Sequence, residues 1–299
     1  MMSNMVRFFL TLSALFLALV MLVCQSPPSS TSLAEVLKHE IAAVKEEIPS
    51  YRLTIGAHRG ASVSHRENTL PALQEAEADA GYAFVEFDVQ YSGDQQIVLF
   101  HDRRLFRLFG KIDALDKTSY ADLLHLTNGE LVLYREAMNI VGKKINLEIK
   151  SQGHQQDDQR LADEVIADIR KRGRQKDVMI SSISSELVRY LSERYPEIKT
   201  GQIFWLTWST YLHFEALTEG LFDRFKATDA DYLLLHVANL RNIEDLLKLK
   251  PPGKTIMFWD FDDRMYMVHK DLADRLWGTS ILSEIWRRLC FNLANLLRR

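Results

Sequence analysis

Cysteine is almost absent from the sequence, and the two that occur, Cys24 and Cys290, show neither a pairing pattern nor a metal-ligand spacing. This scarcity excludes a disulfide-rich framework and a cysteine-based zinc site. Proline and glycine are also few, at 7 and 13 residues, while 47% of the residues are hydrophobic and 26% are charged. The composition therefore excludes collagenous and disordered proteins and indicates a globular chain.

An excess of charge of either sign is missing as well. The 37 lysines and arginines nearly balance the 40 acidic residues, which leaves a formal net charge of -3. Such a chain has no bulk attraction for nucleic acid or for an acidic membrane surface, so we expect no nucleic-acid partner. Any site for an anion must be local. The length of 299 residues allows one large domain or two ordinary ones.

The longest uncharged stretch lies near the N-terminus, where residues 8–24 carry no charge. This stretch is typical of a signal sequence or a membrane anchor, although it is short for a complete crossing. Bulky residues precede Cys24, which argues against signal cleavage and against lipid attachment. We expect residues 1–24 to form an uncleaved single-pass anchor, with Arg7 in the cytoplasm and the rest of the chain outside. A secreted form is the alternative if the segment is cleaved.

Residues 25–50 follow as a proline-broken polar linker and a stalk helix, and residues 51–299 form the main domain. The end of that domain, residues 282–299, has an amphipathic helical pattern with leucines opposed by arginines. This C-terminal helix either lies on an anionic bilayer or docks on the main domain, and we favour docking for its first half.

Short apolar segments alternate with amphipathic ones from residue 53 onward. Strands are expected at 53–58, 83–89, 145–150, 178–182, 199–204, 231–236, 255–260 and 276–281. Helices are expected at 70–80, 159–171, 185–194 and 240–249. Eight such units predict an α/β protein with a distorted (β/α)8 TIM-type barrel. An open doubly wound sheet is the alternative.

One connection breaks the alternation. The segment 95–102 follows the second strand so closely that no right-handed crossover fits, and the chain must fold back at Gly93 as a β-hairpin insertion. Residues at equal distances from a hairpin turn become neighbours across the strands. His101 is therefore expected near Glu86 and Asp88.

Glu86 and Asp88 are two residues apart, so their carboxylates share one face of the strand. Two buried carboxylates repel each other unless a cation neutralises them. Caps of loops or pairs with arginine are the alternative for these two acids. Glu148 and Lys150 share a face in the same way and would add a third oxygen ligand and a phosphate contact, or else a simple salt bridge.

His58, Arg59 and Gly60 end the first expected strand, where active sites of barrels gather. Arg59 offers a permanently charged fork that suits a phosphate. Glycine after this pair would allow a ligand to approach the backbone closely. Taken with the acids and His101, these residues are the inventory for metal-assisted attack on a phosphodiester.

The motifs together resemble the glycerophosphodiester phosphodiesterase family. The similarity covers about residues 53–282 and rests on five short motifs in order: His58-Arg59-Gly60, Glu67-Asn68-Thr69-Leu70, Glu86-Phe87-Asp88-Val89, His101-Asp102 and Glu148-Ile149-Lys150. Where the family usually has proline before the second motif, this chain has Arg66, preceded by His65. The late strand also departs from the family pattern, because it reads Trp259-Asp260-Phe261-Asp262.

The resemblance implies a role for each matching position. Glu86, Asp88 and Glu148 would hold Mg²⁺ or Ca²⁺, and His58 and His101 would act as general acid and base. Arg59 and Lys150 would bind the phosphate. Glu67 and Asn68 would support the loop beside His58. Arg66 would then either reach the substrate or face solvent.

The expected activity is hydrolysis of glycerophosphodiesters to an alcohol and glycerol 3-phosphate. Lysophospholipase D or sphingomyelinase D activity on membrane lipids is the alternative, with a lysophospholipid as substrate. The aromatic segment 203–208 would suit it as a lipid-accepting rim, unless these side chains belong to the core. A catalytically silent, membrane-tethered scaffold is a third hypothesis, and retention of both histidines and all three acids weighs against it.

Overall fold

The computed structural model describes residues 53–205, 207–211, 215–236, 238–239, 243–259 and 264–268. The predicted anchor (1–24), the linker and stalk (25–50), the last predicted strand (276–281) and the C-terminal helix (282–299) lie outside these residues. Within the described ranges, no helix is both long enough and apolar enough to cross a membrane.

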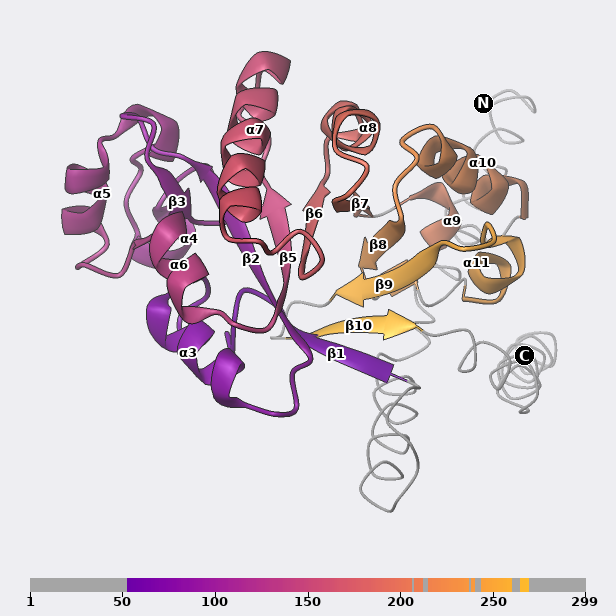
Figure 1. The fold of residues 1–299 in the computed structure, drawn as a ribbon, viewed down its shortest axis with the longest axis horizontal. Coiled ribbons are helices and arrows are strands. Elements are labelled where there is room, and N and C mark those ends of the chain that lie inside the picture. The colour runs from indigo at the N-terminus through magenta and orange to yellow at the C-terminus, as the bar shows by residue number, and fades with distance from the viewer. Residues whose placement is uncertain are drawn as a thin grey trace, which may run out of the picture.

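A closed barrel of eight strands forms the centre of the protein (Figure 1). Its strands are β1 (Leu53–Ala57), β2 (Phe84–Tyr91), β5 (Lys144–Ile149), β6 (Val178–Ser182), β7 (Lys199–Phe204), β8 (Tyr232–His236), β9 (Thr255–Trp259) and β10 (Arg264–Val268). Parallel pairing runs from β1 through β2 and β5 to β9, and β10 pairs with both β9 and β1. The barrel is therefore confirmed over the open doubly wound sheet.

The strand that closes the barrel differs from the prediction. β10 is antiparallel to both of its neighbours, β1 and β9. Only residues 260–263 separate it from β9, and a parallel connection needs a dozen residues or more. The short link forces the chain to turn back, so β10 takes the place that we expected residues 276–281 to fill.

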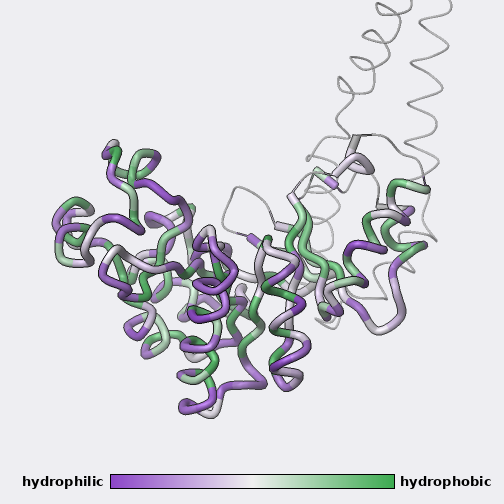
Figure 2. The backbone as a smooth tube through the Cα atoms, turned by 90° about the horizontal axis from the view of Figure 1, so that it is seen from above, coloured by the Kyte–Doolittle hydropathy of each residue, from purple (hydrophilic) through white to green (hydrophobic). Residues whose placement is uncertain are grey.

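Amphipathic helices cover the outside of the barrel. They are α3 (Leu70–Ala78), α6 (Tyr134–Ile140), α7 (Gln155–Lys171), α8 (Ser185–Arg194), α9 (Trp208–Tyr211), α10 (Glu215–Lys226) and α11 (Ile243–Leu249). In α7, for example, Leu161, Val165 and Ile169 are buried against the strands while charged residues occupy the outer face. Figure 2 shows the same alternation as green and purple along the outer coils. The four predicted helices correspond to α3, α7, α8 and α11.

The predicted hairpin is confirmed, and it opens a larger insertion. β3 (Ile97–Leu99) pairs antiparallel with β2, with Val89 opposite Leu99 and Tyr91 opposite Ile97. The insertion continues through α4 (Phe106–Phe109), η1 (Leu115–Lys117), α5 (Tyr120–Leu126) and β4 (Val132–Leu133). A separate hydrophobic cluster, which includes Leu105, Leu115 and Leu123, holds it together. In Figure 1 the insertion lies on the β2 side of the barrel, away from β8 and β9.

Candidate active site

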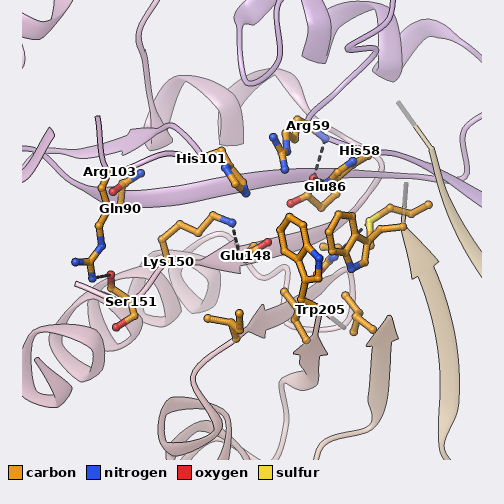
Figure 3. Close-up of a pocket in the computed structure, with 16 residues that line it drawn as sticks. His58, Arg59, Glu86, Gln90, His101, Arg103, Glu148, Lys150, Ser151 and Trp205 are labelled. Atoms are coloured by element: carbon orange, nitrogen blue, oxygen red, sulfur yellow. Dashed lines mark hydrogen bonds and ion pairs between the residues drawn. The ribbon is translucent and has the colours of Figure 1, made fainter. Parts of the chain in front are cut away.

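The parallel strands end at a cavity of about 300 Å³ that contains six of the predicted site residues. These are His58, Arg59, Glu86, His101, Glu148 and Lys150. Figure 3 shows Arg103 and Ser151 toward one end of this cavity, with His58, Arg59 and Trp205 toward the other. The structure thus brings these six residues together, and the hairpin carries His101 to the cavity.

Three acids meet at this cavity: Glu86 and Glu148 line it, and Asp88 is buried beside them. Asp88 of β2 lies in register with Glu148 of β5, and Glu86 is two residues earlier on the same face of β2. Oxygen atoms of the three carboxylates lie within 4.8 Å of one another. Glu86 and Asp88 are buried. Such a compact set of oxygen ligands fits a hard divalent cation such as Mg²⁺ or Ca²⁺.

The electrostatics of the three acids support this fit. Burial, together with the neighbouring Asp88 and Glu148 charges, raises the pKa of Glu86 well above its usual range. Burial also raises the pKa of Glu148. Asp88 behaves differently: although burial opposes ionisation, Lys150, His101 and Arg59 lower its pKa well below the usual range. The site thus carries a surplus of negative potential that a cation would relieve.

Lys150 lies among these acids. Its Nζ is 2.9 Å from Asp88 Oδ1 and also bonds Glu148. Burial lowers the pKa of Lys150, but Asp88 and Glu148 outweigh it and the net direction is upward. The salt bridge with Glu148 that the sequence left open is therefore present, and it extends to Asp88.

Arg59 is held by three acidic side chains. Its backbone N–H donates to Glu86 Oε2 at 2.7 Å, its Nη1 donates to Glu67 at 2.9 Å, and its Nε is 3.6 Å from Asp88 Oδ2. The backbone of Arg59 is left-handed, with φ 61°. This uncommon conformation turns the N–H toward Glu86 and costs strain that the contacts offset.

The presence of glycine at position 60 is explained by packing, whereas the sequence suggested close approach of a ligand. Its φ is +78°, and a Cβ at this position would lie 2.7 Å from the backbone of Ala72 in α3. Glycine is therefore required because the loop after β1 packs directly on the helix that follows it.

The two histidines reach the cavity from different segments. His58 follows β1, and its Nε2 is 4.0 Å from Glu86 Oε2, with its ring 5.7 Å from that of Trp259. His101 follows β3, and its Nδ1 is 2.6 Å from Asp102 Oδ1. Because an ionised carboxylate only accepts hydrogen bonds, Nδ1 of His101 carries the proton, and Nε2 is the atom available for proton exchange.

A chain of ion pairs connects the His101 side of the site to Arg59. Arg107 of α4 donates to Asp102 Oδ2 at 2.7 Å and to both oxygens of Glu67 at 2.6 and 2.8 Å. Burial opposes ionisation of Asp102, but hydrogen bonds from His101 and Arg107 lower its pKa. Arg107 was missed by sequence reasoning, because nothing in its spacing places α4 beside the loop after β1.

Gln90 was also missed, although its position on β2 offered a signal. It shares the inward face of Glu86 and Asp88 by the period of two. Its Nε2 donates to the carbonyls of Phe100 at 2.6 Å and Asp102 at 3.0 Å. Gln90 therefore fixes the backbone on both sides of His101.

Asn68 supports Asp88 by two hydrogen bonds. Its Nδ2 donates to Asp88 Oδ2 at 2.8 Å, and its Oδ1 accepts from the Asp88 backbone N–H at 3.1 Å. Glu67 and Asn68 thus lie behind the cavity, beside the residues that line it. His65 and Arg66 are elsewhere: His65 pairs with Glu75, and Arg66 pairs with Glu130 and lies over Phe109.

Besides its polar residues, the cavity has an apolar wall. It consists of Ile183, Ile203, Trp205, Leu234, Trp259 and Met265. Ile203 is buried, whereas Trp205 is 43% exposed. The rings of Trp205 and Trp259 pack edge to face at 5.2 Å. The aromatic segment after β7 therefore contributes both a buried and an accessible apolar surface to the site.

Known proteins share this architecture. The crystal structure of a glycerophosphodiester phosphodiesterase from Thermotoga maritima has 29% sequence identity and a TM-score of 0.55, covering 70% of this chain and 87% of that one. A phosphodiesterase from Oleispira antarctica, solved with its product sn-glycerol-3-phosphate, has the same fold at 24% identity and a TM-score of 0.55, covering 75% and 88%.

Curated sequences agree. Human lysophospholipase D GDPD3 is 30% identical over 92 residues, which are 31% of this chain and 26% of the relative, so the match spans about a quarter of that protein. The model of the glycerophosphoryl diester phosphodiesterase family matches residues 58–273, which include the catalytic cavity and most of the barrel. The chain therefore belongs to the glycerophosphoryl diester phosphodiesterase family.

Proposed function

We propose that the protein hydrolyses glycerophosphodiesters to an alcohol and glycerol 3-phosphate in a reaction that depends on a divalent cation. The observation that carries this proposal is the cluster of Glu86, Asp88 and Glu148 within 4.8 Å, at a cavity that Glu86, Glu148 and both histidines line. Family membership and the product named for the Oleispira antarctica relative support the choice of substrate.

The acidic and basic residues of the site have different roles in binding the phosphate. Glu86, Asp88 and Glu148 would hold Mg²⁺ or Ca²⁺, which when bound offsets negative charge on the phosphoryl oxygens. Arg59 presents a guanidinium already oriented by Glu67 and Asp88, so little side-chain entropy is lost when it binds a phosphate oxygen. Lys150 adds a compact positive charge on the opposite side of Asp88.

His58 and His101 share the two proton transfers. One removes the proton of the nucleophile, which is water or the neighbouring glycerol hydroxyl, and the other protonates the departing alkoxide. The Asp102 carboxylate stabilises the protonated ring of His101 and fixes its tautomer. Attack by water gives the products directly, whereas attack by the hydroxyl passes through a cyclic phosphate.

Release of choline from glycerophosphocholine tests the proposal. The wild-type chain with Mg²⁺ or Ca²⁺ should release choline, and chelation by EDTA or the His101→Ala substitution should abolish the release. His125→Ala is the matched control, because His125 is exposed on α5. Activity that survives both EDTA and His101→Ala would contradict the assigned chemistry. Folded, metal-loaded protein that turns over no diester would favour the scaffold hypothesis.

A second candidate function is lysophospholipase D activity. The apolar wall, with Ile183 and Trp205 at its accessible side, suits an acyl chain beside the phosphodiester, and the human relative carries that activity in its name. Trp205→Ala should then raise KM for lysophosphatidylcholine and leave glycerophosphocholine turnover unchanged. Equal effects on both substrates would argue against acyl-chain binding at Trp205. Sphingomyelinase D activity is tested in parallel with sphingomyelin as substrate.

The proposed location is a membrane, with residues 1–24 as a single-pass anchor and the catalytic domain on the extracytoplasmic side. The uncharged stretch after Arg7 supports this placement. Protease added outside sealed cells or right-side-out vesicles should digest the catalytic domain. Protection of the domain until the membrane is permeabilised would reverse the orientation.

A further inference from the structure

Large exposed hydrophobic side chains are concentrated at one end of the barrel. In the described part of the chain they are Val63, Phe106, Ile112, Ile183, Trp205 and Trp208, a set named the apolar rim below. Ile112 and Trp208 are the most accessible, at 76% and 75%. Single exposed hydrophobics are ordinary on a soluble surface, but grouping at one end marks an interaction surface.

The connections place this end at the cavity. Val63 follows β1, Ile183 follows β6, and Trp205 and Trp208 follow β7, all at the carboxyl ends of parallel strands where the site opens. Phe106 lies in the insertion between Arg103 and Arg107.

Hydrogen bonds tie that part of the insertion to the same end of the barrel. Arg103 Nη2 donates to the Ser151 carbonyl after β5 at 3.3 Å, and Arg107 bonds Glu67 after β1. Figure 3 shows Arg103 and Trp205 on opposite sides of the cavity, so Trp205 and the part of the insertion that begins at Arg103 flank it from two sides.

Positive charge accompanies the rim on the insertion. The segment 103–112 contains Arg103, Arg104, Arg107 and Lys111 and no acidic residue, although the whole chain has a net charge of -3. Asp102 and Glu67 engage Arg107, and Arg104 bonds the Ile112 carbonyl. Arg104 and Lys111 are both exposed beside Phe106 and Ile112.

This combination identifies the chemistry of the partner. Nucleic acid would complement the cations but not Ile112, Trp208 or Val63. A second copy of the chain would have to present the same rim, because the described residues expose no other large hydrophobic side chain, and pairing of two rims would bring like charges together. An anionic bilayer satisfies both features, because tryptophan and aliphatic residues enter the interfacial layer while basic residues contact lipid phosphates.

We infer that the catalytic end of the barrel docks on an anionic lipid bilayer through the apolar rim, with Arg104 and Lys111 contacting lipid phosphates. The mouth of the cavity then faces the bilayer surface. This interaction surface goes beyond the proposed reaction, since it does not depend on which diester is cleaved. It is also separate from the predicted anchor, which would tether the chain without orienting the barrel.

A fluorescent label on the rim of the full-length chain tests the inference. Cys24→Ser and Cys290→Ser remove the native thiols, and Ile112→Cys carries an NBD fluorophore. Lys176→Cys is the matched control, because Lys176 is exposed in the link before β6, at the other end of the barrel. The labelled chain is reconstituted in vesicles of phosphatidylcholine alone or with added phosphatidylserine, and brominated lipids serve as quenchers.

The label at residue 112 should shift to shorter wavelength and be quenched by brominated lipid only in vesicles with phosphatidylserine, whereas the label at 176 should stay in water. Arg104→Gln with Lys111→Gln should weaken this docking about 30-fold, which corresponds to about 1 kcal/mol for each charge. Raising the salt concentration should weaken it in the same direction. A Trp208→Cys label should respond like the label at 112.

Three outcomes would overturn the inference. A label at 112 that stays in water in phosphatidylserine vesicles rules out docking. A shift of the label at 112 to shorter wavelength without quenching by brominated lipid shows that another segment of the chain or a second copy covers the rim. Equal quenching in phosphatidylcholine alone contradicts the choice of an anionic surface. Because the readout is fluorescence, an inactive phosphodiesterase assay would refute the proposed reaction and leave this result unaffected.

Discussion

Arg107 is the residue through which the insertion acts on the chemistry. It bonds Asp102, the partner of His101, and Glu67, the partner of Arg59, so one guanidinium connects the proposed proton-transfer group with the proposed phosphate-binding group. Its side chain is 45% exposed, so we expect little contribution to global stability. We therefore expect Arg107 to act by positioning His101 and Arg59 through their acidic partners.

Arg107→Ala should lower kcat for glycerophosphocholine by about 10- to 100-fold, with KM and the urea unfolding midpoint changed little. Arg107→Lys should restore activity only in part, because a single ammonium lacks the fork that spans two carboxylates. Arg104→Ala, in the same segment, is the control and should retain activity on this soluble substrate. An unchanged kcat in Arg107→Ala would show that Arg107 does not position the site residues.

Glu86 is expected to make the metal-free protein less stable as the pH rises. Its pKa is raised in the folded state, mainly by burial and then by Asp88 and Glu148, so between the unfolded value of 4.5 and the folded value the native state binds more protons. Stability from this group therefore falls as the pH increases through that window. Glu86→Gln should remove this decline, as urea unfolding in EDTA at pH 5 and pH 7 would show.

Divalent cations provide the complementary measurement for Glu86. In the wild type, Mg²⁺ or Ca²⁺ at 100 times its Kd should stabilise the fold by about 2.7 kcal/mol, and Glu86→Gln should lose most of this gain. Asp88, with its lowered pKa, contributes the opposite pH trend, because its stabilisation is lost as the pH falls. Identical pH slopes in the wild type and Glu86→Gln would contradict the assignment.

At the scale of elements, local sequence predicted what depends on neighbours in the chain. The short link around Gly93 required a hairpin, and the period of two placed Glu86 and Asp88 on one face. The path of the insertion was not predictable, because it depends on how several short elements pack together, as Leu105 does with Leu115 and Leu123. Arg107 reaches Glu67 only as a result of that packing.

Gly93→Ala should detach the hairpin from the insertion. The Gly93 N–H donates to the Thr118 carbonyl at 2.8 Å, and a Cβ would lie 2.7 Å from the Thr118 nitrogen. We expect a loss of about 1–3 kcal/mol in the free energy of unfolding from this overpacking. Gly220→Ala in α10 is the control: its Cβ meets nothing within 4 Å, and the change should stabilise the helix by about 0.5–1 kcal/mol.

At the scale of the molecule, the pattern of alternating strands and helices predicted a barrel. The strand that closes this barrel differs from the predicted one. Repeated units led us to expect a parallel strand at 276–281, which lies outside the described residues. The actual closing strand follows β9 after only four residues, 260–263, which are too few for a crossover helix, so no periodic signal distinguished it. Which segment closes the barrel depends on the space left between β9 and β1, and this space is set by the arrangement of all the other strands.

β10 places the side chain of Met265 at the centre of the barrel. Truncation of this side chain tests how far the stability of the fold depends on β10. Met265 is 2% exposed, packs with Phe84, Leu234 and Trp259, and its Sδ accepts from Asn146 Nδ2 at 3.7 Å. Met265→Ala should lower the free energy of unfolding by about 2–5 kcal/mol through lost packing and a cavity.

Hydrogen exchange locates the effect of Met265→Ala within the barrel. Protection should fall most at β1 and β9, the two strands that β10 joins, and less at β5 and β6 on the other side of the ring. Met267→Ala on the same strand is the comparison, because Met267 is only partly buried against this cluster and should cost less. Equal loss of protection in all strands would mean that the barrel unfolds as one unit and that β10 is no weaker than the rest.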